Sequence, residues 1–593
     1  MKIVQLISTS NEDNIHKDKV VYLGNWCAED KYIIRDQTVN SYHWDDRKKL
    51  EKDNKYINGL YEEILEELSN SLNKLHSQKF SKNYWRTIAG YWLFVYLSVN
   101  SERWGNIENV FSKHKDINLY QSLNVESNPL PANTREFINL VSDKKWNHLN
   151  YSNIIKFFIK KKNLKIKLEP KKYNNEPFYY NYTENFIHKF KTSLRKIYLN
   201  FFKNKIKENK IVFFKTYLGL KNELILNLKY KQLPAILINK IFKKNANFKL
   251  RKILNLNYMP KNTFEEFIIE DIFKNLPTEF IENYKEIENY IEKSNLPSKP
   301  TLIMSTRSLA TDNIFIRYVA IQKEKGCRFI YSQHGGAYGH IKFSWSEDHE
   351  IKISDYYLTW GWQKQDEQKV VPFFVLKNIN KFKFKNKKKI KKICYFIRSR
   401  QKYTGRIDSS TGSNQMAKYY ENCINFYDKF NNKNNAITLV PRFHEALFEW
   451  NHINIWKKLG IKNISLTNKE SLENVYKNYD LLIYSYIGTG FLESLALNKP
   501  FILVSSIDEW PLRAEAVEDF KALEKAKIFF KNNDDAIIHI EKIKEKDINE
   551  WWESPEVDKI KKFFKKKYAK LDSNNNKTLT LKNLIDKIIS NEI

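Results

Sequence analysis

Residues 301–332 read TLIMSTRSLATDNIFIRYVAIQKEKGCRFIYS, and this stretch decides the fold. The apolar runs at 301–305 and 327–332 each predict a buried strand. Between them, residues 311–326 have the pattern of a helix, with Asp312 in the N-cap position and a glycine past the end. A strand, a helix and a second strand within about 30 residues are typical of a parallel sheet. The stretch therefore predicts an α/β protein.

Strand patterns recur on both sides of this unit. Towards the C-terminus they lie at 356–362, 393–397, 436–440, 463–466, 480–486 and 500–504. One of the intervening helices, at 468–478, is preceded by Thr467 and has Glu470 three residues on, the pattern of a capping box. Towards the N-terminus, two short strands are expected within 2–8 and 19–27, followed by helices. Strands that alternate with helices in this way predict doubly wound sheets.

The order of these elements divides the chain into two halves. Residues 1–380 form the predicted first domain, which contains a basic and mostly helical insertion at about 113–290. A lysine-rich run at 381–392 has no apolar period and is expected to be a linker. Residues 393–546 form the predicted second domain, and 547–593 form a helical tail. The predicted fold class is α/β, with two doubly wound, Rossmann-like halves.

The charge restricts the partners. Lys and Arg residues number 101 against 69 Asp and Glu, for a net charge of +32. The lysines are spread along the chain without a nucleic-acid-binding motif, so we do not expect nucleic acid as a partner. An anionic membrane surface or a phosphorylated substrate fits the charge better. The segment 156–215 interleaves lysine with apolar residues and could lie at a membrane interface, but we favour amphipathic helices whose lysines face water.

The apolar runs and the cysteines indicate the compartment. The apolar run at 89–99 is shorter than the roughly 18 residues of a membrane span, so we expect a buried helix there. The apolar stretch at the N-terminus is too short for a signal peptide. The four cysteines include no CxxC pair and are consistent with buried thiols in a reducing compartment. We expect a cytoplasmic protein that works at the inner face of the inner membrane.

Ligands of open parallel sheets bind at the carboxyl ends of the strands, and the loop after 327–332 is the first candidate. It contains Gln333, His334, Gly335 and Gly336, although the whole chain has only 15 glycines. The glycines allow backbone amides to approach a ligand closely. His334 could bind a phosphate, hydrogen-bond a sugar hydroxyl or act as a base. The alternative is a tight turn with a structural histidine.

A second candidate loop follows the strand at 480–486. Gly488, Thr489 and Gly490 open a helix, where exposed amides and the helix dipole favour an anion. Ser485 supplies a hydroxyl, and Glu493 lies one turn into the helix, where it could accept hydrogen bonds from a ribose. A well-capped helix with no ligand is the alternative.

Two further loops place cations at the same sheet edge. Arg442 and His444 follow the strand at 436–440 and suit a diphosphate or a carboxylate. Arg398 follows the strand at 393–397 and could meet an anionic group of the donor. Arginines on a solvated surface would have the same pattern.

The N-terminal segment 43–47 supplies candidate bases. His43, Asp45 and Asp46 could accept a proton from an acceptor hydroxyl, and Arg47 could bind an anion. Paired aspartates before a helix are also typical of helix caps. No His or Cys cluster has metal-ligand spacing, so we expect chemistry that needs neither a metal nor a cofactor.

Several motifs together resemble a known family. They are LGNWC (23–27), YHWDDRKKL (42–50), LYEEILEELSNSLNKLH (60–76), YWRTIAGYWL (84–93), YSQHGGAYG (331–339), LTWGW (358–362) and GTGFLESLALNKP (488–500). In this order they are similar to a family of transferases from bacterial surface-carbohydrate loci, and the two α/β halves resemble GT-B glycosyltransferases. The resemblance implies a GT-B-like arrangement and transfer of a sugar from a nucleotide sugar to a glycan, a lipid-linked or a protein acceptor.

A more distant resemblance concerns bacterial transferases that use CMP-activated acidic sugars. Those enzymes hold the nucleotide phosphate with a histidine motif and a pair of hydroxyls. Here His444 together with Ser485 and Thr489 could occupy these places. The chain departs from the pattern, because Pro441 precedes His444 instead of following it.

The leading hypothesis is therefore a glycosyltransferase. The C-terminal half would bind the donor, and His334 with the segment 43–47 would face the acceptor. Two other hypotheses stay open: a nucleotide-sugar epimerase or phosphotransferase with the same architecture, and a non-catalytic basic scaffold that binds membranes or nucleic acid.

Overall fold

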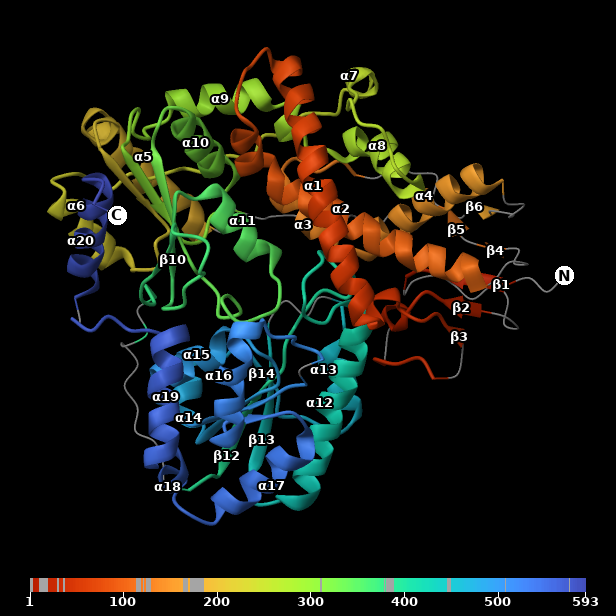
Figure 1. The fold of residues 1–593 in the computed structure, drawn as a ribbon, viewed down its shortest axis with the longest axis vertical. Helices are drawn as coiled ribbons and strands as arrows, with labels where there is room; N and C mark the ends of the chain where they lie inside the picture. Colours follow the sequence, from red (N-terminus) through yellow and green to blue (C-terminus); the bar gives the residue numbers. More distant parts are fainter. Residues whose placement is uncertain are drawn as a thin grey trace.

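The computed structural model describes residues 4–9, 20–28, 31–35, 38–113, 119–120, 122–123, 129–163, 169–170, 186–309, 312–377, 379, 389–444, 449–506, 508–574 and 576–592. Within these ranges the chain forms two lobes, each built on a parallel sheet (Figure 1). Most of the predicted linker, residues 381–388, lies outside the described residues.

The first lobe has a five-stranded sheet in the order β11-β10-β9-β8-β7, in which all neighbouring strands are parallel. Its strands are β7 (Ile211–Phe214), β8 (Leu302–Ser305), β9 (Arg328–Ser332), β10 (Tyr356–Thr359) and β11 (Val370–Pro372). The helix α10 (Asn313–Glu324) connects β8 to β9, which confirms the strand–helix–strand unit predicted for 301–332. One prediction was incomplete, because β7 lies inside the stretch expected to be mostly helical. Its four residues are too few to show a period, and only pairing with β8 makes them a strand.

The second lobe has a six-stranded parallel sheet in the order β14-β13-β12-β15-β16-β17. Its strands are β12 (Lys392–Phe396), β13 (Thr438–Phe443), β14 (Ser465–Leu466), β15 (Leu481–Tyr484), β16 (Phe501–Val504) and β17 (Phe529–Phe530). The strand order reverses its direction between β12 and β15, and ligands of such sheets bind at this switch point. The two predicted Rossmann-like halves are thus confirmed.

Helices cover both faces of the second sheet (Figure 1). They are α12 (Ser413–Lys433), α13 (His452–Lys458), α14 (Leu472–Asn478), α15 (Thr489–Ala496), α16 (Ala514–Lys525) and α17 (Asn533–Lys544). The predicted capping box at Thr467 was wrong, because the cap of α14 is Ser471. Thr467 instead continues the strand by donating its backbone N–H to Phe443, and Glu470 binds Arg442. Tertiary partners outweigh the local capping pattern here.

A third, smaller sheet occupies the N-terminal region. Its parallel strands β3 (Thr38–Val39), β2 (Val20–Tyr22), β1 (Val4–Ile7) and β4 (Leu119–Tyr120) lie in that order. The N-terminal strands therefore do not join the five-stranded sheet. Helices follow them: α1 (Arg47–His76), α2 (Lys82–Lys113), α3 (Thr134–Leu140) and α4 (Lys144–Lys162). A separate pair, β5 (Ser122–Leu123) and β6 (Glu169–Pro170), completes the strands.

The helix α2 is the central helix of the first lobe. Apolar residues surround it on every side, and Trp85, Trp92 and Phe94 are fully buried. It packs against α1, α4 and α10 (Figure 1). A helix that is apolar all round belongs in a core, which confirms the buried helix expected at 89–99. Among the described residues, no helix is long and apolar enough to cross a membrane.

The remaining helices of the first lobe are α5 (Phe186–Lys207), α6 (Leu220–Lys229), α7 (Phe248–Ile253), α8 (Thr263–Asn275), α9 (Tyr284–Lys293) and α11 (Trp345–Ile353). The tail comprises α18 (Ile548–Trp552), α19 (Pro555–Tyr568) and α20 (Lys577–Ile589). Whereas α19 packs on the second lobe, α20 returns to the first lobe and lies beside α6 (Figure 1). The tail thus joins the two lobes a second time.

The anchor of α20 can be tested. Ile585 is fully buried in a cluster that includes Ile211 of β7, so Ile585→Ala should lower the free energy of unfolding by about 2–5 kcal/mol. Leu579 lies on the same helix but is 41% exposed, and Leu579→Ala should change it by less than about 0.5 kcal/mol. Urea denaturation measures both, and equal effects of the two substitutions would show that α20 is not anchored by its apolar face.

Candidate active site

The carboxyl ends of the two large sheets face each other, and their loops meet at several points, one of which is a very close backbone contact. Gly336, in the loop after β9, donates its backbone N–H to Oγ1 of Thr489, the first residue of α15, at 3.0 Å. A Cβ built on Gly336 would lie 2.6 Å from Cα of Thr489 and 2.7 Å from the carbonyl oxygen of Gly488. Only glycine fits this contact. The loop after β9 and the loop after β15, which the sequence marks separately, therefore meet between the lobes.

His334 lies beside this contact and faces a carboxyl group. Its Nδ1 is 3.4 Å from Oε1 of Glu350, on α11. Nδ1 is buried and has no hydrogen-bond partner in the described part of the chain, whereas the side chain as a whole is 32% exposed. The accessible part of the ring is thus the part away from Glu350. Tyr338 and Tyr357 each donate a hydrogen bond to the Glu350 carboxyl at 2.9 Å, which fixes its orientation.

The surroundings of this pair disfavour charge on both groups. Burial lowers the pKa of His334 to about 4, and the positive charges of Arg307 and Arg406 lower it further in the same direction. Burial raises the pKa of Glu350 well above its ordinary value, against the effect of its tyrosine partners. At neutral pH the imidazole is therefore unprotonated, and burial favours the protonated form of the carboxyl. A neutral imidazole with an accessible edge can accept a proton.

A cavity of about 210 Å³ lies between the first lobe and the loop after β12. One wall is formed by Tyr91 and Val95 of α2, by Ile138 in α3 and by Val141 directly after α3. The opposite wall is the β12 loop, whose lining residues are Arg398, Ser399, Arg400, Gln401, Gly405, Arg406 and Asp408. One wall is thus largely apolar and the other strongly cationic.

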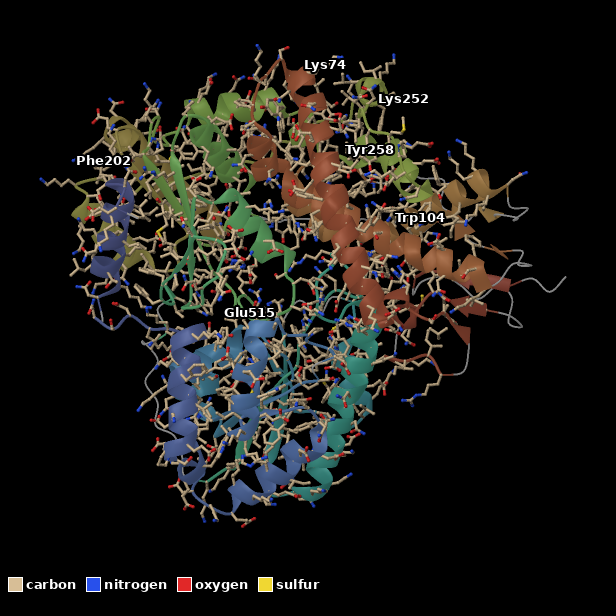
Figure 2. The ribbon with its side chains drawn as sticks, viewed as in Figure 1. Lys74, Trp104, Phe202, Lys252, Tyr258 and Glu515 are labelled. Carbon is tan, nitrogen blue, oxygen red and sulfur yellow. The ribbon has the colours of Figure 1, made fainter. Side chains whose placement is uncertain are left out.

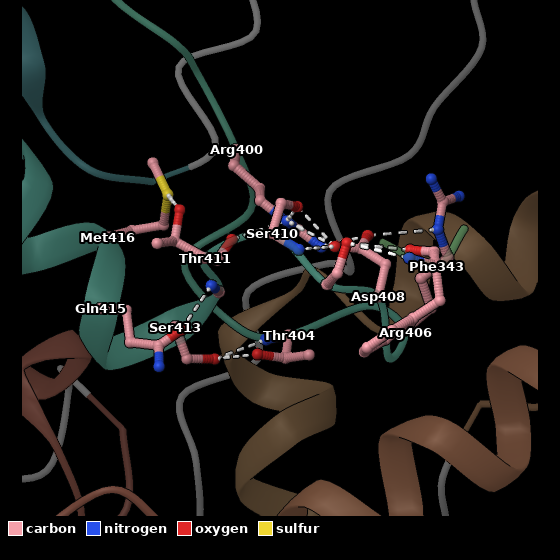
Figure 3. A network of polar contacts seen from close by, with 12 residues as sticks. Phe343, Arg400, Thr404, Arg406, Asp408, Ser410, Thr411, Ser413, Gln415 and Met416 are labelled. Carbon is pink, nitrogen blue, oxygen red and sulfur yellow. Dashed lines mark hydrogen bonds and ion pairs between the residues drawn. The ribbon is translucent and has the colours of Figure 1, made fainter. Parts of the chain in front are cut away.

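Three arginines and one aspartate set the charge of the cavity. Arg400 forms an ion pair with Asp408, with Nη2 and Oδ2 2.8 Å apart, and donates to Ser410 Oγ and the Thr411 carbonyl at 2.6 Å each (Figure 3). Arg406 lies 3.7 Å from the same carboxylate and donates to the Tyr91 hydroxyl at 3.0 Å. Arg400 and Arg406 hold the pKa of Asp408 well below its usual value, against burial. One carboxylate therefore balances only part of the positive charge.

Arg398 carries the unbalanced charge. Its guanidinium lies 4.2 Å from the ring of Trp510, and Nη2 donates to Ser410 Oγ at 3.3 Å. Its Nη1 is buried without a hydrogen-bond partner in the described ranges. Burial, then repulsion from Arg400, lowers the pKa of Arg398 to about 9. A buried donor of this kind gains most from an anionic ligand.

Contacts from the first lobe hold the β12 loop in place. Arg103 of α2 is fully buried, forms an ion pair with Glu102 at 2.8 Å and donates to the Thr404 carbonyl at 2.6 Å. Thr404 in turn donates its backbone N–H to Ser413 at 2.8 Å (Figure 3). Arg47 at the start of α1 donates to the Ser409 carbonyl. The cationic loop is thus fixed by the lobe that faces it.

Most predicted residues of the β9 and β15 loops support the backbone. Gln333 is buried, and its Oε1 accepts hydrogen bonds from the Trp360 backbone at 2.9 Å and from Trp362 Nε1 at 2.8 Å. Ser485 is buried between Tyr419 and the Phe396 carbonyl. These contacts shape the loops from behind, since neither of the two polar side chains is left for a ligand.

Glycines and an acidic residue complete the β15 loop. Gly488 is the N-cap residue of α15, and a Cβ there would lie 2.5 Å from the Tyr486 ring, while one on Gly490 would lie 2.5 Å from the Tyr484 ring. Glu493 is 4% exposed and pairs with Lys377 at 2.6 Å. A ligand that bound Glu493 would first have to displace this lysine.

The cations after β13 have different surroundings. Arg442 is buried and donates to Ser465 Oγ at 2.5 Å and to the Glu470 carbonyl at 2.7 Å, so it joins β13 to the segment before α14. The backbone N–H of His444 donates to Ser399 Oγ at 3.2 Å, which places its exposed side chain beside the β12 loop. The backbone of His444 thus contacts Ser399, a residue that lines the cavity.

The segment 43–47 makes structural contacts. His43 is buried against the Glu102 carbonyl at 3.1 Å, and burial lowers its pKa to about 3. Asp45 lies 3.3 Å from Lys418 Nζ, and Asp46 caps α1 by accepting from the backbone N–H groups of the next turn. These contacts favour a structural role over contact with substrate, and Arg47 positions the β12 loop through the Ser409 carbonyl.

Three ionisable residues of the site were not among the predicted residues: Arg406, Asp408 and Glu350. A signal for the first two exists, because three of the chain's 15 arginines fall within 398–406, in a chain otherwise rich in lysine. Nothing local marks Glu350, which reaches His334 only through the fold. Among the described residues, no group of three His, Cys, Asp or Glu side chains has the geometry of a metal site.

The family follows from the whole chain. The model of the LIC12162 family transferase matches residues 4–584. The chain belongs to this family. The transferase activity implied by the sequence resemblance is thereby confirmed at the level of the class of reaction. No curated protein matches the chain.

Three solved structures are distantly similar to this LIC12162 family transferase. Staphylococcus aureus TarM, solved with fondaparinux, α-GlcNAc-glycerol and UDP, is 13% identical with a TM-score of 0.28, over 45% of this chain and 52% of TarM. A candidate UDP-N-acetylglucosamine 2-epimerase from Listeria monocytogenes is 11% identical with a TM-score of 0.31, over 60% and 91% of the two chains. The glycotransferase of kitacinnamycin is 10% identical with a TM-score of 0.32, over 64% and 99%. Similarities this low say nothing of the activity of this chain.

The contact between the two loops gives the first test of the site. Gly336→Ala should separate the loops, because the new methyl group would meet backbone atoms of Gly488 and Thr489 that cannot rotate away. We expect transferase activity to fall by about tenfold or more while the protein stays folded. At Gly335 the nearest atom to an added Cβ is Thr489 Oγ1 at 4.0 Å, so Gly335→Ala is the matched control. Equal activities of the two variants would contradict the contact.

The buried histidines give a pH-dependent test of stability. Burial lowers the pKa of His334 to about 4 and of His349, His340 and His452 to about 3. In the unfolded chain these groups have pKa values near 6.5, so as the pH falls the unfolded chain binds protons before the folded chain does. The contribution of these histidines to the free energy of unfolding is therefore fully present above about pH 6.5 and decreases as the pH drops towards 4. Carboxyls with raised pKa values, such as Glu350, oppose this trend.

Urea denaturation at pH 7 and pH 5 measures the effect. We expect a loss of several kcal/mol at pH 5, since each histidine contributes about 2 kcal/mol there. His349→Phe, which keeps the stacking on Trp345 and removes the titrating ring, should make the loss smaller. An equal loss in His349→Phe and in the wild-type protein would show that burial does not lower the pKa of His349.

Proposed function

We propose that this LIC12162 family transferase moves a sugar from a nucleotide-activated donor to a surface-carbohydrate acceptor. The observation that carries the proposal is the cavity between the lobes, where Arg398, Arg400 and Arg406 face one carboxylate, Asp408. Excess positive charge in a partly buried site favours the binding of an anion that accepts hydrogen bonds from the arginines. The phosphate of a nucleotide sugar is such a group.

The arginines would hold the leaving group. As the sugar departs, negative charge grows on the phosphate, and fixed cations in a site shielded from water stabilise that charge most. The unused Nη1 of Arg398 and the guanidinium of Arg406 are the donors for this step. The positive charge supports chemistry in which the arginines do the work that a metal does elsewhere.

His334 would remove the proton from the acceptor hydroxyl. Its neutral state, its accessible edge and the carboxyl of Glu350 behind Nδ1 fit this role. The base would lie in the first lobe and the donor cations in the second, so a productive complex requires the interlobe contact at Gly336. We extend the proposal to a glycan, lipid-linked or protein acceptor, and to a CMP-linked acidic sugar as one donor to be tested.

Nucleotide binding tests the proposal. Melting temperatures measured with CMP, UDP, GDP and ADP should rise by a few degrees with one of them, because a ligand bound only to the folded state stabilises it. Arg398→Ala should abolish this rise. Arg35→Ala is the control, since Arg35 pairs with Glu421 on the surface, where it is 71% exposed. If no nucleotide changes the melting temperature, the donor assignment is wrong.

Incubation with the identified donor tests the reaction. Release of the nucleotide should require an acceptor and should fall by about 100-fold or more in Arg406→Ala. An altered sugar released without acceptor would instead favour an epimerase.

A further inference from the structure

The outer face of α6 is apolar and uncovered in the structure. Leu220, Leu224 and Leu228 are 81%, 49% and 69% exposed. They are spaced by four residues, so they form one stripe along the helix. Leu226 on the opposite face is fully buried. The helix thus has apolar residues on both faces, and the fold buries only the inner face.

Neighbouring residues extend this surface. Phe201 and Phe202 near the end of α5 are 81% and 43% exposed, and Figure 2 shows Phe202 at the same edge of the molecule as α6 in Figure 1. The segment after α6 runs along α5, because the Tyr198 hydroxyl donates to the Pro234 carbonyl at 3.0 Å. We call Phe201, Phe202 and the three α6 leucines the edge patch. The patch thus draws on both α5 and α6.

Positive charge surrounds the edge patch. Residues 201–231 contain eight lysines and two glutamates. Of the glutamates, Glu223 accepts hydrogen bonds from the backbone and hydroxyl of Thr216, at 3.0 and 2.6 Å, and so faces the chain. Lys221, Lys229 and Lys231 are all exposed beside the leucines. Leucine flanked by lysine is the pattern of a surface that enters the headgroup region of an anionic bilayer.

The support beneath α6 is rigid. Tyr230, just past the helix, donates to Asp586 of α20 at 2.9 Å, and Leu226 packs in the cluster that holds the buried face of α20. The tail therefore fixes α6 from inside and leaves its leucines outward. A preformed surface loses little conformational freedom when it binds.

We propose that the edge patch docks the protein on an anionic lipid bilayer. The charge decides between a bilayer and a second copy of the chain. Two copies joined face to face through this patch would bring lysines against lysines, which is repulsive, whereas an anionic bilayer complements them. The bilayer also accepts the apolar side chains between the lysines. This docking is independent of the proposed sugar transfer.

Vesicle flotation without substrates tests the docking. The full-length protein should float with vesicles that contain phosphatidylglycerol and should remain behind with pure phosphatidylcholine, and added salt should weaken the binding. The triple substitution Leu220→Ser, Leu224→Ser and Leu228→Ser should weaken binding about tenfold or more. Leu459→Ser is the matched control, because Leu459 is 50% exposed next to α13 of the other lobe.

Melting temperature and light scattering complete the experiment. The exposed leucines make few internal contacts, so the triple variant should keep its melting temperature. Unchanged binding of the triple variant, or equal binding to both kinds of vesicle, would overturn the proposal. A wild-type dimer that the triple variant turns into a monomer would also overturn it, because the patch would then be occupied by a second copy. Loss of nucleotide binding would leave docking intact, so the two proposals fail separately.

Discussion

The approach of Gly336 to Thr489 is the constraint on which the rest of the site depends. A backbone N–H of one lobe meets a side-chain oxygen of the other at 3.0 Å, in a space with no room for a Cβ. Because the contact lies at the carboxyl ends of both sheets, the loops after β9, β12 and β15 lie in the same region. Two other contacts also hold the lobes together. Arg103 of α2 donates to the β12 loop of the second lobe, and α20 of the C-terminal tail packs on the first lobe.

The electrostatics of the site follow from this enclosure. Buried ions need partners, and Asp408 serves both Arg400 and Arg406 while Arg398 keeps a donor unused. The same positive charge helps to keep His334 unprotonated. A site that is cationic on one side and holds a neutral imidazole on the other separates two tasks, the binding of an anion and the acceptance of a proton. This separation is the physical basis of the proposed transfer reaction.

Much of the architecture was predictable because it is local. The alternation of strands and helices from 301 onward, and the buried helix at 89–99, follow from apolar spacing and were confirmed. The exceptions have a common reason. The strand β7 exists because it pairs with β8, and the cap of α14 is Ser471 because Thr467 and Glu470 have better partners in the folded chain. Local patterns fail where a contact distant in sequence competes with them.

The candidate site divides in the same way. The sequence by itself determined that glycines and polar residues follow the strands, and hence that His334 and Thr489 lie at the carboxyl ends of strands. Only the tertiary structure decided which of these side chains are available. It engaged Gln333, Ser485 and Arg442 in support of the backbone, paired Glu493 with Lys377, and brought Glu350 to His334. The reason is physical: spacing along the chain fixes which residues share a strand or helix, whereas hydrogen bonding and charge pairing depend on neighbours that only folding brings together.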